Sequence, residues 1–327
     1  MALCDKSLSF QLGWRRRSTS LGWTPLRVGV GVGRKSFWLT FHAVACFNGL
    51  ALDRQNPFSY LMTNATIESP TNSRIKELVK LRESPRRRRE RGCFFVEGAN
   101  DLLALVRAGR ELIEFYFCPS MVEQFGESSA LEELREMGIP FCETSEIAHA
   151  KASYKSGTHG IIGVLRTWEL GFDVFSVAND APLVVLDEVE KPGNLGAILR
   201  TIEAFGAAGV ILSDPAVDFF NPNVVRSSRG LFGGIPVALG SKTDVRDWLK
   251  KSARHIVGTS SRAQEIMGNK KFPTDAAFLF GSEKVGLGEF WQDQPDQWVK
   301  IGIQGQASSL NLNASVACFL YEYNRLT

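Results

Sequence analysis

From residue 183 onward, the chain alternates short, continuously apolar segments with amphipathic ones, and this pattern limits its possible folds. The apolar segments include LVVLD, GVILS and AAFLFG, and intervening segments such as GAILRTIEAFG carry a helical spacing of apolar residues. Strands that are apolar on both faces occur where helices cover both sides of a parallel sheet. The sequence therefore predicts an α/β domain over residues 183–327, with functional residues in the loops that follow the strands.

Upstream, residues 73–166 show a second, shorter alternation of predicted helices and strands. Helices are expected at SRIKELVKL and ANDLLALVRAG, and strands at FFVEG, ELIEFYFCP and HGIIGVLR. These segments predict a compact α/β domain of ordinary size. A linker over residues 167–182 would join it to the larger one, so the chain is expected to hold two domains.

Residues 1–61 differ from the rest, because they are rich in arginine, poor in acidic residues and weakly periodic. We expect a disordered extension, an organelle transit peptide or sequence upstream of the true start, with Met62 a suitable mature start. The expected location is the cytoplasm, or a mitochondrion or plastid if the segment is a transit peptide. The stretch GVGVGRKS is superficially similar to a phosphate loop, but Arg34 stands where that motif needs glycine.

Composition excludes several classes of protein without pointing to one. The chain is 44% hydrophobic and 22% charged, which is ordinary for a soluble globular protein. No segment approaches the roughly 18 apolar residues of a membrane helix, so no membrane is expected. The six cysteines form no C-x-x-C pair and the four histidines are isolated, so neither disulfides nor a metal site is expected. The net charge of +3 indicates little about partners, so the distribution of charge matters more.

The loop after LVVLD, EKPGNLGAILR, combines glycines with polar residues. Gly193 and Gly196 would permit a tight turn and the close approach of a ligand to the backbone. Asn194 can cap the following helix, and Arg200 can point back toward the loop. The structural alternative is that Asn194 is only a cap and Arg200 only a surface residue.

Two further loops carry residues of the same kinds. After AAFLF comes GSEKVGLGEF, in which two glycines flank Glu283, a weak signal by itself. After WVK comes IGIQGQASSLNLNASVA, where Ser309 is a suitable helix N-cap. Asn311 is then expected inside the first turn, where asparagine is a mediocre helix former, which favours a functional reading.

Taken together, the three segments resemble the motifs of the SpoU/TrmH family of RNA ribose 2′-O-methyltransferases over residues 183–326. The first motif, N-x-G-x-x-x-R-T with a later F-G, is matched by Asn194, Gly196, Arg200, Thr201, Phe205 and Gly206. The second, G-x-E-x-x-G-L, is matched by Gly281, Glu283, Gly286 and Leu287. The third, near I-P-M-x-G with a later S-L-N and Y-E, is matched by Ile301, Gly305, Ser309, Leu310, Asn311, Tyr321 and Glu322. The chain departs from the third motif at Gly302 and Ile303, and Asn313 stands where a second serine is common.

The resemblance implies a fold, an assembly and a cofactor. The larger domain would be an α/β trefoil knot of the SPOUT class, in which the C-terminal segment threads through a loop, a rare exception to unknotted topology. The enzyme would be a homodimer that binds S-adenosyl-L-methionine (AdoMet) and needs no metal. The residues implied to line the cofactor pocket, largely through backbone groups, are Gly281, Gly286, Leu287, Ile301, Gly305 and Leu310.

The resemblance also implies attack of an RNA ribose 2′-hydroxyl on the methyl group of the cofactor. Arg200 would sit at the hydroxyl, where it is often proposed as the base, but arginine is effectively always protonated in a protein. We therefore expect Arg200 to stabilise the forming alkoxide and to hold a phosphate, while the RNA phosphate or water takes the proton. Asn194, Glu283, Ser309 and Asn311 would orient Arg200 and the ribose.

Residues 73–166 resemble, more loosely, the substrate-binding domain that precedes the catalytic domain in many rRNA-modifying members and is similar to a small RNA-binding ribosomal protein. Its basic run is a candidate for phosphate contacts, although a solvated face or a flexible connector is the structural alternative. The principal candidates are Arg86, Arg87, Arg88, Arg89 and Arg91, and lesser ones are Lys155, His159, Arg226 and Arg229. The additional domain favours rRNA over tRNA as the substrate.

Two rival functions are considered. A nucleotide-dependent oxidoreductase would place G-x-G-x-x-G after LVVLD, but the chain has KPGNLGAI there. A non-catalytic RNA-binding paralogue would be expected to lose the polar residues of the three motifs, which this chain keeps. A tRNA 2′-O-methyltransferase remains the alternative within the family.

Overall fold

The computed structural model describes residues 27–32, 35–40, 66–154, 159–268 and 271–326. The chain divides into two units, residues 1–59 and 60–327. In the first unit, β1 (Arg27–Val32) and β2 (Lys35–Thr40) pair as an antiparallel ribbon. The rest of the predicted N-terminal extension, residues 1–61, lies outside the described residues. No described helix has both the length and the hydropathy that spanning a membrane would require.

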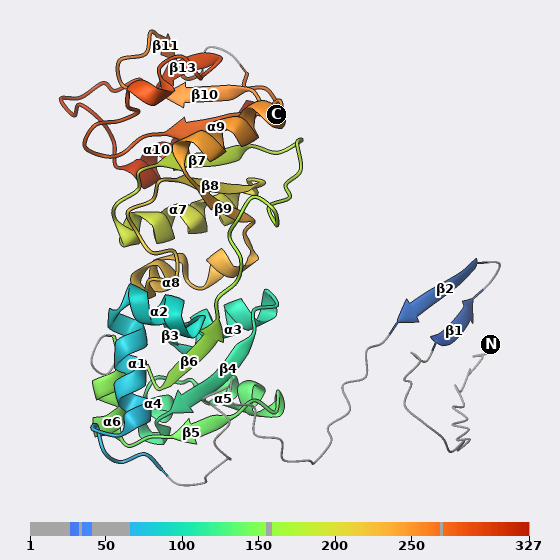
Figure 1. The fold of residues 1–327 in the computed structure, drawn as a ribbon, viewed down its shortest axis with the longest axis vertical. Coiled ribbons are helices and arrows are strands. Elements are labelled where there is room, and N and C mark those ends of the chain that lie inside the picture. Colours follow the sequence, from blue (N-terminus) through green and yellow to red (C-terminus); the bar gives the residue numbers. More distant parts are fainter. Residues whose placement is uncertain (1–26, 33–34, 41–65, 155–158, 269–270, 327) are drawn as a thin grey trace, which may run out of the picture. The chain divides into compact units, whose positions relative to one another are not determined.

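In the second unit, residues 73–166 form a four-stranded sheet packed with helices, which we call the small lobe (Figure 1). The strand order is β3-β6-β4-β5, in which β4 and β5 are parallel and the other neighbours antiparallel. The strands are β3 (Cys93–Glu97), β4 (Leu112–Phe117), β5 (Phe141–Glu143) and β6 (Ile161–Arg166). The helices are α1 (Ser73–Glu83), α2 (Pro85–Arg91), α3 (Ala99–Arg107), α4 (Pro119–Gln124), α5 (Ser128–Glu136) and α6 (Glu146–Ala152).

The basic run of the small lobe is a helix, α2, which the sequence analysis did not assign to an element. The Ser84 side chain caps its start by accepting from the Arg87 backbone N–H at 3.2 Å, and Pro85 occupies the first turn. Gly92 ends it in the left-handed conformation, with a φ of 58°. The arginines therefore point in different directions around a helix, and they do not form a flexible connector.

Residues 183–326 form the large lobe, whose seven-stranded parallel sheet has the order β11-β13-β10-β12-β7-β8-β9. The strands are β7 (Leu183–Asp187), β8 (Gly209–Ser213), β9 (Val237–Gly240), β10 (Ile256–Thr259), β11 (Glu265–Ile266), β12 (Ala277–Phe280) and β13 (Gln297–Lys300). The helices are α7 (Pro192–Phe205), α8 (Pro222–Ser228), α9 (Lys242–Lys251) and α10 (Leu312–Leu326), with 3-10 turns η1 (Leu231–Gly234) and η2 (Glu289–Trp291). The predicted parallel α/β fold is confirmed, and the trefoil knot stays a prediction.

Two helix starts differ from the sequence predictions. α7 begins at Pro192 with Lys191 as its N-cap, so Asn194 lies in the first turn and does not cap the helix. α10 begins at Leu312, and the residue before it, Asn311, accepts the Asn313 backbone N–H at 3.0 Å. Asn311 therefore has the capping position that was predicted for Ser309.

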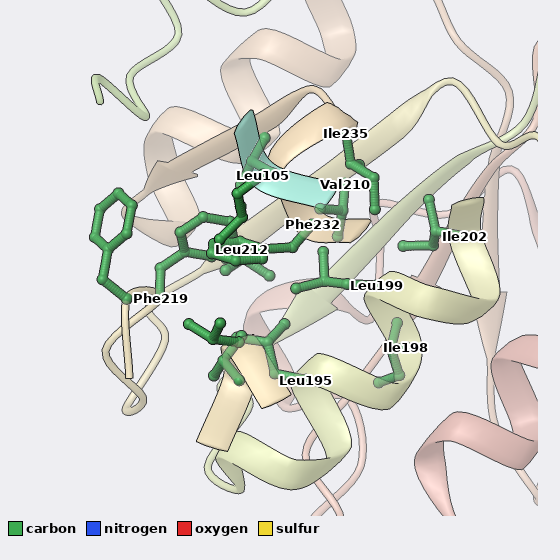
Figure 2. Packing of buried hydrophobic residues seen from close by; sticks show 14 of the residues in the cluster. Leu105, Leu195, Ile198, Leu199, Ile202, Val210, Leu212, Phe219, Phe232 and Ile235 are labelled. Atoms are coloured by element: carbon green, nitrogen blue, oxygen red, sulfur yellow. The ribbon is translucent and has the colours of Figure 1, made fainter. Parts of the chain in front are cut away.

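The two lobes share one hydrophobic core. The spacing i, i+3, i+4, i+7 on α7 buries Leu195, Ile198, Leu199 and Ile202 against the large sheet. Figure 2 shows Leu105 of the small-lobe helix α3 beside Phe232 of η1, and both belong to the same cluster as the α7 side chains. Rings add a second connection, since those of Phe94 in β3 and Phe220 have centroids 5.0 Å apart. The small lobe is thus part of the same packed unit as the large sheet.

An acidic residue, Asp101 of α3, is buried beside this shared core with 7% of its surface exposed. Burial raises the pKa of Asp101 to about 6, although nearby Arg229 opposes the shift. The folded protein therefore binds the proton more tightly than the unfolded chain, whose aspartate pKa is about 3.9. Stability from this group is present at pH 4 and falls as the pH rises toward 6.

Replacing Asp101 with asparagine should therefore stabilise the protein at pH 7.5 by up to about 2 kcal/mol, and by about a third as much at pH 4.5. Urea unfolding of the full chain at both pH values measures the difference. Asp293→Asn, on the exposed surface, is the control and should change neither midpoint. An Asp101→Asn effect of equal size at both pH values would contradict the assignment.

Candidate functional site

The candidate site lies between two neighbouring strands of the large sheet, at the point where the strand order changes direction. β7 and β12 are adjacent and parallel. After β7 the chain continues to β8 on one side, whereas after β12 it continues to β13 on the other. Ligand sites in open parallel sheets form at such a switch point, beyond the carboxyl ends of the strands. The loops at residues 188–191 and 281–287 both begin there.

Three of the predicted site residues are joined by hydrogen bonds at this point. Asn194 Nδ2 donates to Glu283 Oε1, and Asn311 Nδ2 donates to Asn194 Oδ1 over 3.4 Å. Asn311 Oδ1 in turn accepts the Asn313 backbone N–H. Each amide thus donates on one side and accepts on the other, which fixes its orientation. The structure brings these three loops together as the motifs predicted, while the catalytic roles of the residues stay predictions.

Lys191, which the sequence analysis missed, completes this network. Its Nζ donates to Glu283 Oε2, so both carboxylate oxygens of Glu283 are occupied. A second pair, Lys284 Nζ and Glu190 Oε2, lies 2.8 Å apart between the same two loops. The dipeptide Glu-Lys occurs in both loops, and the two copies pair reciprocally. That repeated dipeptide after two strands is the signal that could have identified Lys191.

Backbone contact closes the loop after β12. A Cβ at Gly281 would stand 2.1 Å from the Gly286 carbonyl carbon and 2.2 Å from the Leu287 nitrogen. Gly286 has a φ of 75° and donates its N–H to the Ser282 carbonyl at 2.9 Å. The Leu287 side chain is buried in the core beneath, so only its backbone faces the loop. Glycine at 281 is required because no side chain fits between the two arms of the loop.

The loop after β13 leaves backbone and apolar groups accessible. A Cβ at Gly305 would meet nothing within 4 Å, and the Leu310 side chain is 39% exposed. Ile301 packs against the shared core. Ser309 is exposed and, among the described residues, has no hydrogen-bond partner. The loop therefore offers open backbone beside an apolar side chain.

Arg200 stands apart from the hydrogen-bonded network. It lies six residues after Asn194 on α7, which turns its side chain about 240° further around the helix axis. The side chain is exposed, and it has no ion-pair or hydrogen-bond partner in the part of the chain that the structure describes. The expected orienting bonds from Asn194, Glu283, Ser309 or Asn311 to Arg200 are therefore not formed within one chain.

The face of α7 that carries Asn194 instead presents Thr201, seven residues on. Thr201 Oγ1 donates to Asn313 Oδ1 at 2.8 Å, which ties α7 to the first turn of α10. Asn313 was given no role from the sequence, and its motif position suggested a serine. Its structural role is to hold α10 where Asn311 reaches Asn194.

The sequence predicted that Gly196 would let a ligand approach the backbone, and this prediction is wrong. Gly196 lies inside α7, and a Cβ there would stand 2.5 Å from the Val224 carbonyl oxygen and 2.6 Å from Ser227 Cβ. Glycine at this position lets α7 and α8 approach closely. Gly193 is different, since a Cβ there would stand 3.5 Å from Asn223 Nδ2, an ordinary contact.

The basic helix α2 divides into exposed and structural arginines. Arg86 and Arg89 are exposed, as predicted for phosphate contacts. Arg87 and Arg91 are half-buried and lie 2.7 and 3.4 Å from a Glu77 oxygen. Pairing with Glu77 raises the pKa of Arg87 above its ordinary value.

The prediction that Arg88 contacts RNA is wrong. Its side chain is 2% exposed and lies 2.6 Å from Asp218 Oδ2, in the loop before α8 of the large lobe. Its Nη1 also donates to the Leu81 carbonyl at 2.6 Å. A charged group at this depth needs a buried partner, and Arg88 has become the ionic connection between the lobes.

Within the described residues, no group of three or more histidine, cysteine or acidic side chains is arranged to hold a metal ion.

Both lobes match known protein families. The model of the SpoU rRNA Methylase family matches residues 181–321. The model of the MRM3-like substrate binding domain matches residues 72–163.

Similar proteins of named activity cover the same two lobes. The 23S rRNA (adenosine(1067)-2'-O)-methyltransferase of Streptomyces azureus is 29% identical over 265 residues, 79% of this chain and 94% of that protein. The crystal structure of an RNA 2'-O ribose methyltransferase is 31% identical with a TM-score of 0.70, covering 80% of this chain and 99% of that one. The SpoU methyltransferase AviRb from Streptomyces viridochromogenes, solved with the cofactor AdoMet, is 25% identical with a TM-score of 0.69, covering 78% and 97%.

Proposed function

This chain belongs to the SpoU rRNA methylase family, and from that premise we propose that it is an AdoMet-dependent methyltransferase acting on a ribose 2′-hydroxyl of ribosomal RNA. The observation that carries the proposal is the meeting of the three motif loops in the hydrogen bonds of Asn194, Glu283 and Asn311. The named activities of the similar proteins, 2′-O-methylation of RNA, support it.

The loops after β12 and β13 fit AdoMet by their chemistry. A Cβ would meet nothing within 4 Å at Gly286, Gly288 or Gly305, so a ligand can approach the backbone closely at these glycines. The exposed side chains of Val285 and Leu310 supply apolar contact for an adenine ring. When bound there, AdoMet supplies a methyl group already activated by its sulfonium.

The residues of the chain position the reacting ribose. Asn194, held by Glu283 and Asn311, presents a fixed amide at the start of α7, and Lys191 balances the charge of Glu283. Fixing the direction of attack accounts for a large part of such a rate. In this proposal, the exposed guanidinium of Arg200 stabilises the forming alkoxide and holds an RNA phosphate, and the proton leaves to RNA or water.

The small lobe and exposed α2 arginines favour a large RNA as the substrate, and tRNA is the alternative. In keeping with the family resemblance, we also propose a homodimer, supported by Tyr321, which is 59% exposed on α10. Sedimentation of the purified chain tests this assembly.

The proposed location is the cytoplasm, or a mitochondrion or plastid if residues 1–61 are a transit peptide, and imaging of a tagged full chain tests it.

Titration calorimetry with AdoMet and methyl transfer to rRNA from cells that lack the gene test the proposed function together. AdoMet binding followed by a 2′-O-methylated nucleotide in rRNA is the expected result. Methylation of tRNA alone would reject the substrate. RNA binding by a folded protein that binds no AdoMet would indicate a non-catalytic paralogue.

Gly281→Ala is expected to weaken AdoMet binding roughly tenfold or more, because the new methyl group must push the peptide bond between Gly286 and Leu287 away from residue 281. Calorimetry measures the change. Gly171→Ala is the matched control, since a Cβ there meets nothing within 4 Å, and its affinity should equal that of the wild type. Unchanged affinity in Gly281→Ala would mean that this loop does not form the pocket.

A further inference from the structure

A groove between the small and large lobes lies outside the candidate active site, and it includes Arg226, which the sequence suggested as a lesser candidate for RNA contacts. One cavity there, of about 260 Å³, is lined by Phe95 and Tyr154 of the small lobe and by Pro222, Val225 and Arg226 of α8. A more open cavity, of about 610 Å³, also includes Tyr154 and lies against α1 and α6. The first is smaller than the roughly 300–1,000 Å³ typical for drug-sized ligands, so it suits one flat ring system.

Tyr154 contributes to both cavities and has the features of a stacking platform. It is 41% exposed, although it is a large aromatic residue. Its backbone N–H donates to Glu97 Oε2 at 2.8 Å, which fixes its position at the end of the small lobe. The guanidinium of Arg226 lies 5.8 Å from the ring centroid, on the opposite lobe. Exposed aromatic rings beside cations bind the bases of single-stranded nucleic acids.

The charge around the groove suits a phosphate backbone. Arg226 on α8 and Arg229, the residue that follows α8, are both exposed. Three carboxylates are near these cations: Glu97, which lines the smaller cavity, accepts from the Tyr154 backbone, and Glu83 lies 2.6 Å from Arg82. The third, Asp101, is buried near Arg226 and Arg229. Cationic side chains next to an aromatic ring therefore remain available to a polyanion.

The groove is connected to the candidate active site through α8. Arg226 Nη2 donates to Asn223 Oδ1 at 3.5 Å. The Asn223 amide in turn lies beside Gly193, the residue before Asn194. A strand of RNA that leaves the site along α8 would therefore enter the groove at Arg226.

We propose that this groove binds an unpaired nucleotide of the substrate RNA near the methylated one, with its base stacked on Tyr154 and its phosphate paired with Arg226. The inference rests on the proposed function for the identity of the substrate. It adds a position at which the enzyme selects single-stranded over double-stranded RNA, because a paired base cannot enter the cavity.

Fluorescence anisotropy with a labelled oligouridylate and the full chain tests the proposal without AdoMet. Tyr154→Ala should weaken binding roughly 5- to 100-fold, while Tyr154→Phe, which keeps the ring, should bind as the wild type does. Arg226→Ala should also weaken binding and reduce its salt dependence. Arg246→Ala is the matched control, since Arg246 lies 5.5 Å over the Phe290 ring in the large lobe away from the groove.

The result separates this inference from the proposed function. Unchanged oligouridylate binding in Tyr154→Ala, or an equal loss in Arg246→Ala, would overturn the groove assignment even if the enzyme methylates RNA. If Tyr154→Phe lost as much oligouridylate binding as Tyr154→Ala, the Tyr154 hydroxyl and not its ring would bind the RNA, and the proposed stacking would also be rejected. If the wild type binds no AdoMet, the proposed function fails, while the dependence of RNA binding on Tyr154 is still measured.

Discussion

Replacing Arg200 with alanine is expected to lower the rate of methyl transfer by a factor of about 10²–10³ or more, the effect of removing one donor to a developing oxyanion. The fold should be intact, because the Arg200 side chain is exposed and has no partner in the described part of the chain. AdoMet affinity should also stay within twofold or so, since Arg200 lies on α7 and not on the loops that fit the cofactor. Single-turnover methylation of rRNA measures the chemical step directly.

Arg200→Lys separates charge from shape. A lysine keeps the charge but cannot contact a phosphate through two parallel N–H groups, so it should recover only part of the rate. Arg246→Ala, which removes a half-buried arginine of the same lobe, should keep the full rate. Wild-type turnover in Arg200→Ala would remove this residue from the mechanism and leave the Asn194 network as the only positioned polar group.

The second large effect concerns stability: Arg88→Ala should lower the free energy of unfolding by about 3–5 kcal/mol. The substitution leaves Asp218 without its partner and removes the donor to the Leu81 carbonyl. Urea unfolding of the full chain measures the loss. Arg86→Ala is the control from the same helix, because Arg86 is 84% exposed and its partner among the described residues is Glu90, a contact worth about 0.5 kcal/mol or less.

A double substitution tests the cause of that loss. Arg88→Met combined with Asp218→Leu removes both charges and should be much more stable than Arg88→Ala, because no unpaired charge remains buried. If the double variant is as unstable as Arg88→Ala, the lost packing of the arginine stem is responsible, and the ion pair contributes little.

The alternation of apolar and amphipathic segments was sufficient to predict the parallel sheet and the loops that meet at its edge. That signal is strong because burial on both faces leaves few other arrangements for LVVLD and AAFLF. The motif spacing likewise indicated that Asn194, Glu283 and Asn311 belong together. Sequence order could not predict their hydrogen bonds, because these depend on how α10 is placed beside α7 by Thr201 and Asn313.

Two of the misassigned residues, Arg88 and Gly196, share a physical reason, which is that their neighbours in space lie in distant parts of the chain. Arg88 resembles its neighbours in sequence, and only the packing of α2 against the large lobe reveals Asp218, 130 residues away, as its partner. Gly196 resembles a loop glycine until α8 is placed 2.5 Å from its missing Cβ. Ser309 was predicted as the cap of α10 in place of Asn311, because the sequence pattern locates a helix start only to within one or two residues.

The core shared by the lobes also bears on how a target nucleotide is chosen. Leu105, Phe94 and Phe232 fill a common interior, so the small lobe cannot swing on residues 167–182 without exposing apolar rings to water. The distance from the outer arginines of α2 to the carboxyl edge of the large sheet is therefore constant. An RNA bound both to the α2 arginines and at the sheet edge would have to span this fixed distance. The number of nucleotides between the part bound to α2 and the reacting ribose would then determine which position is modified.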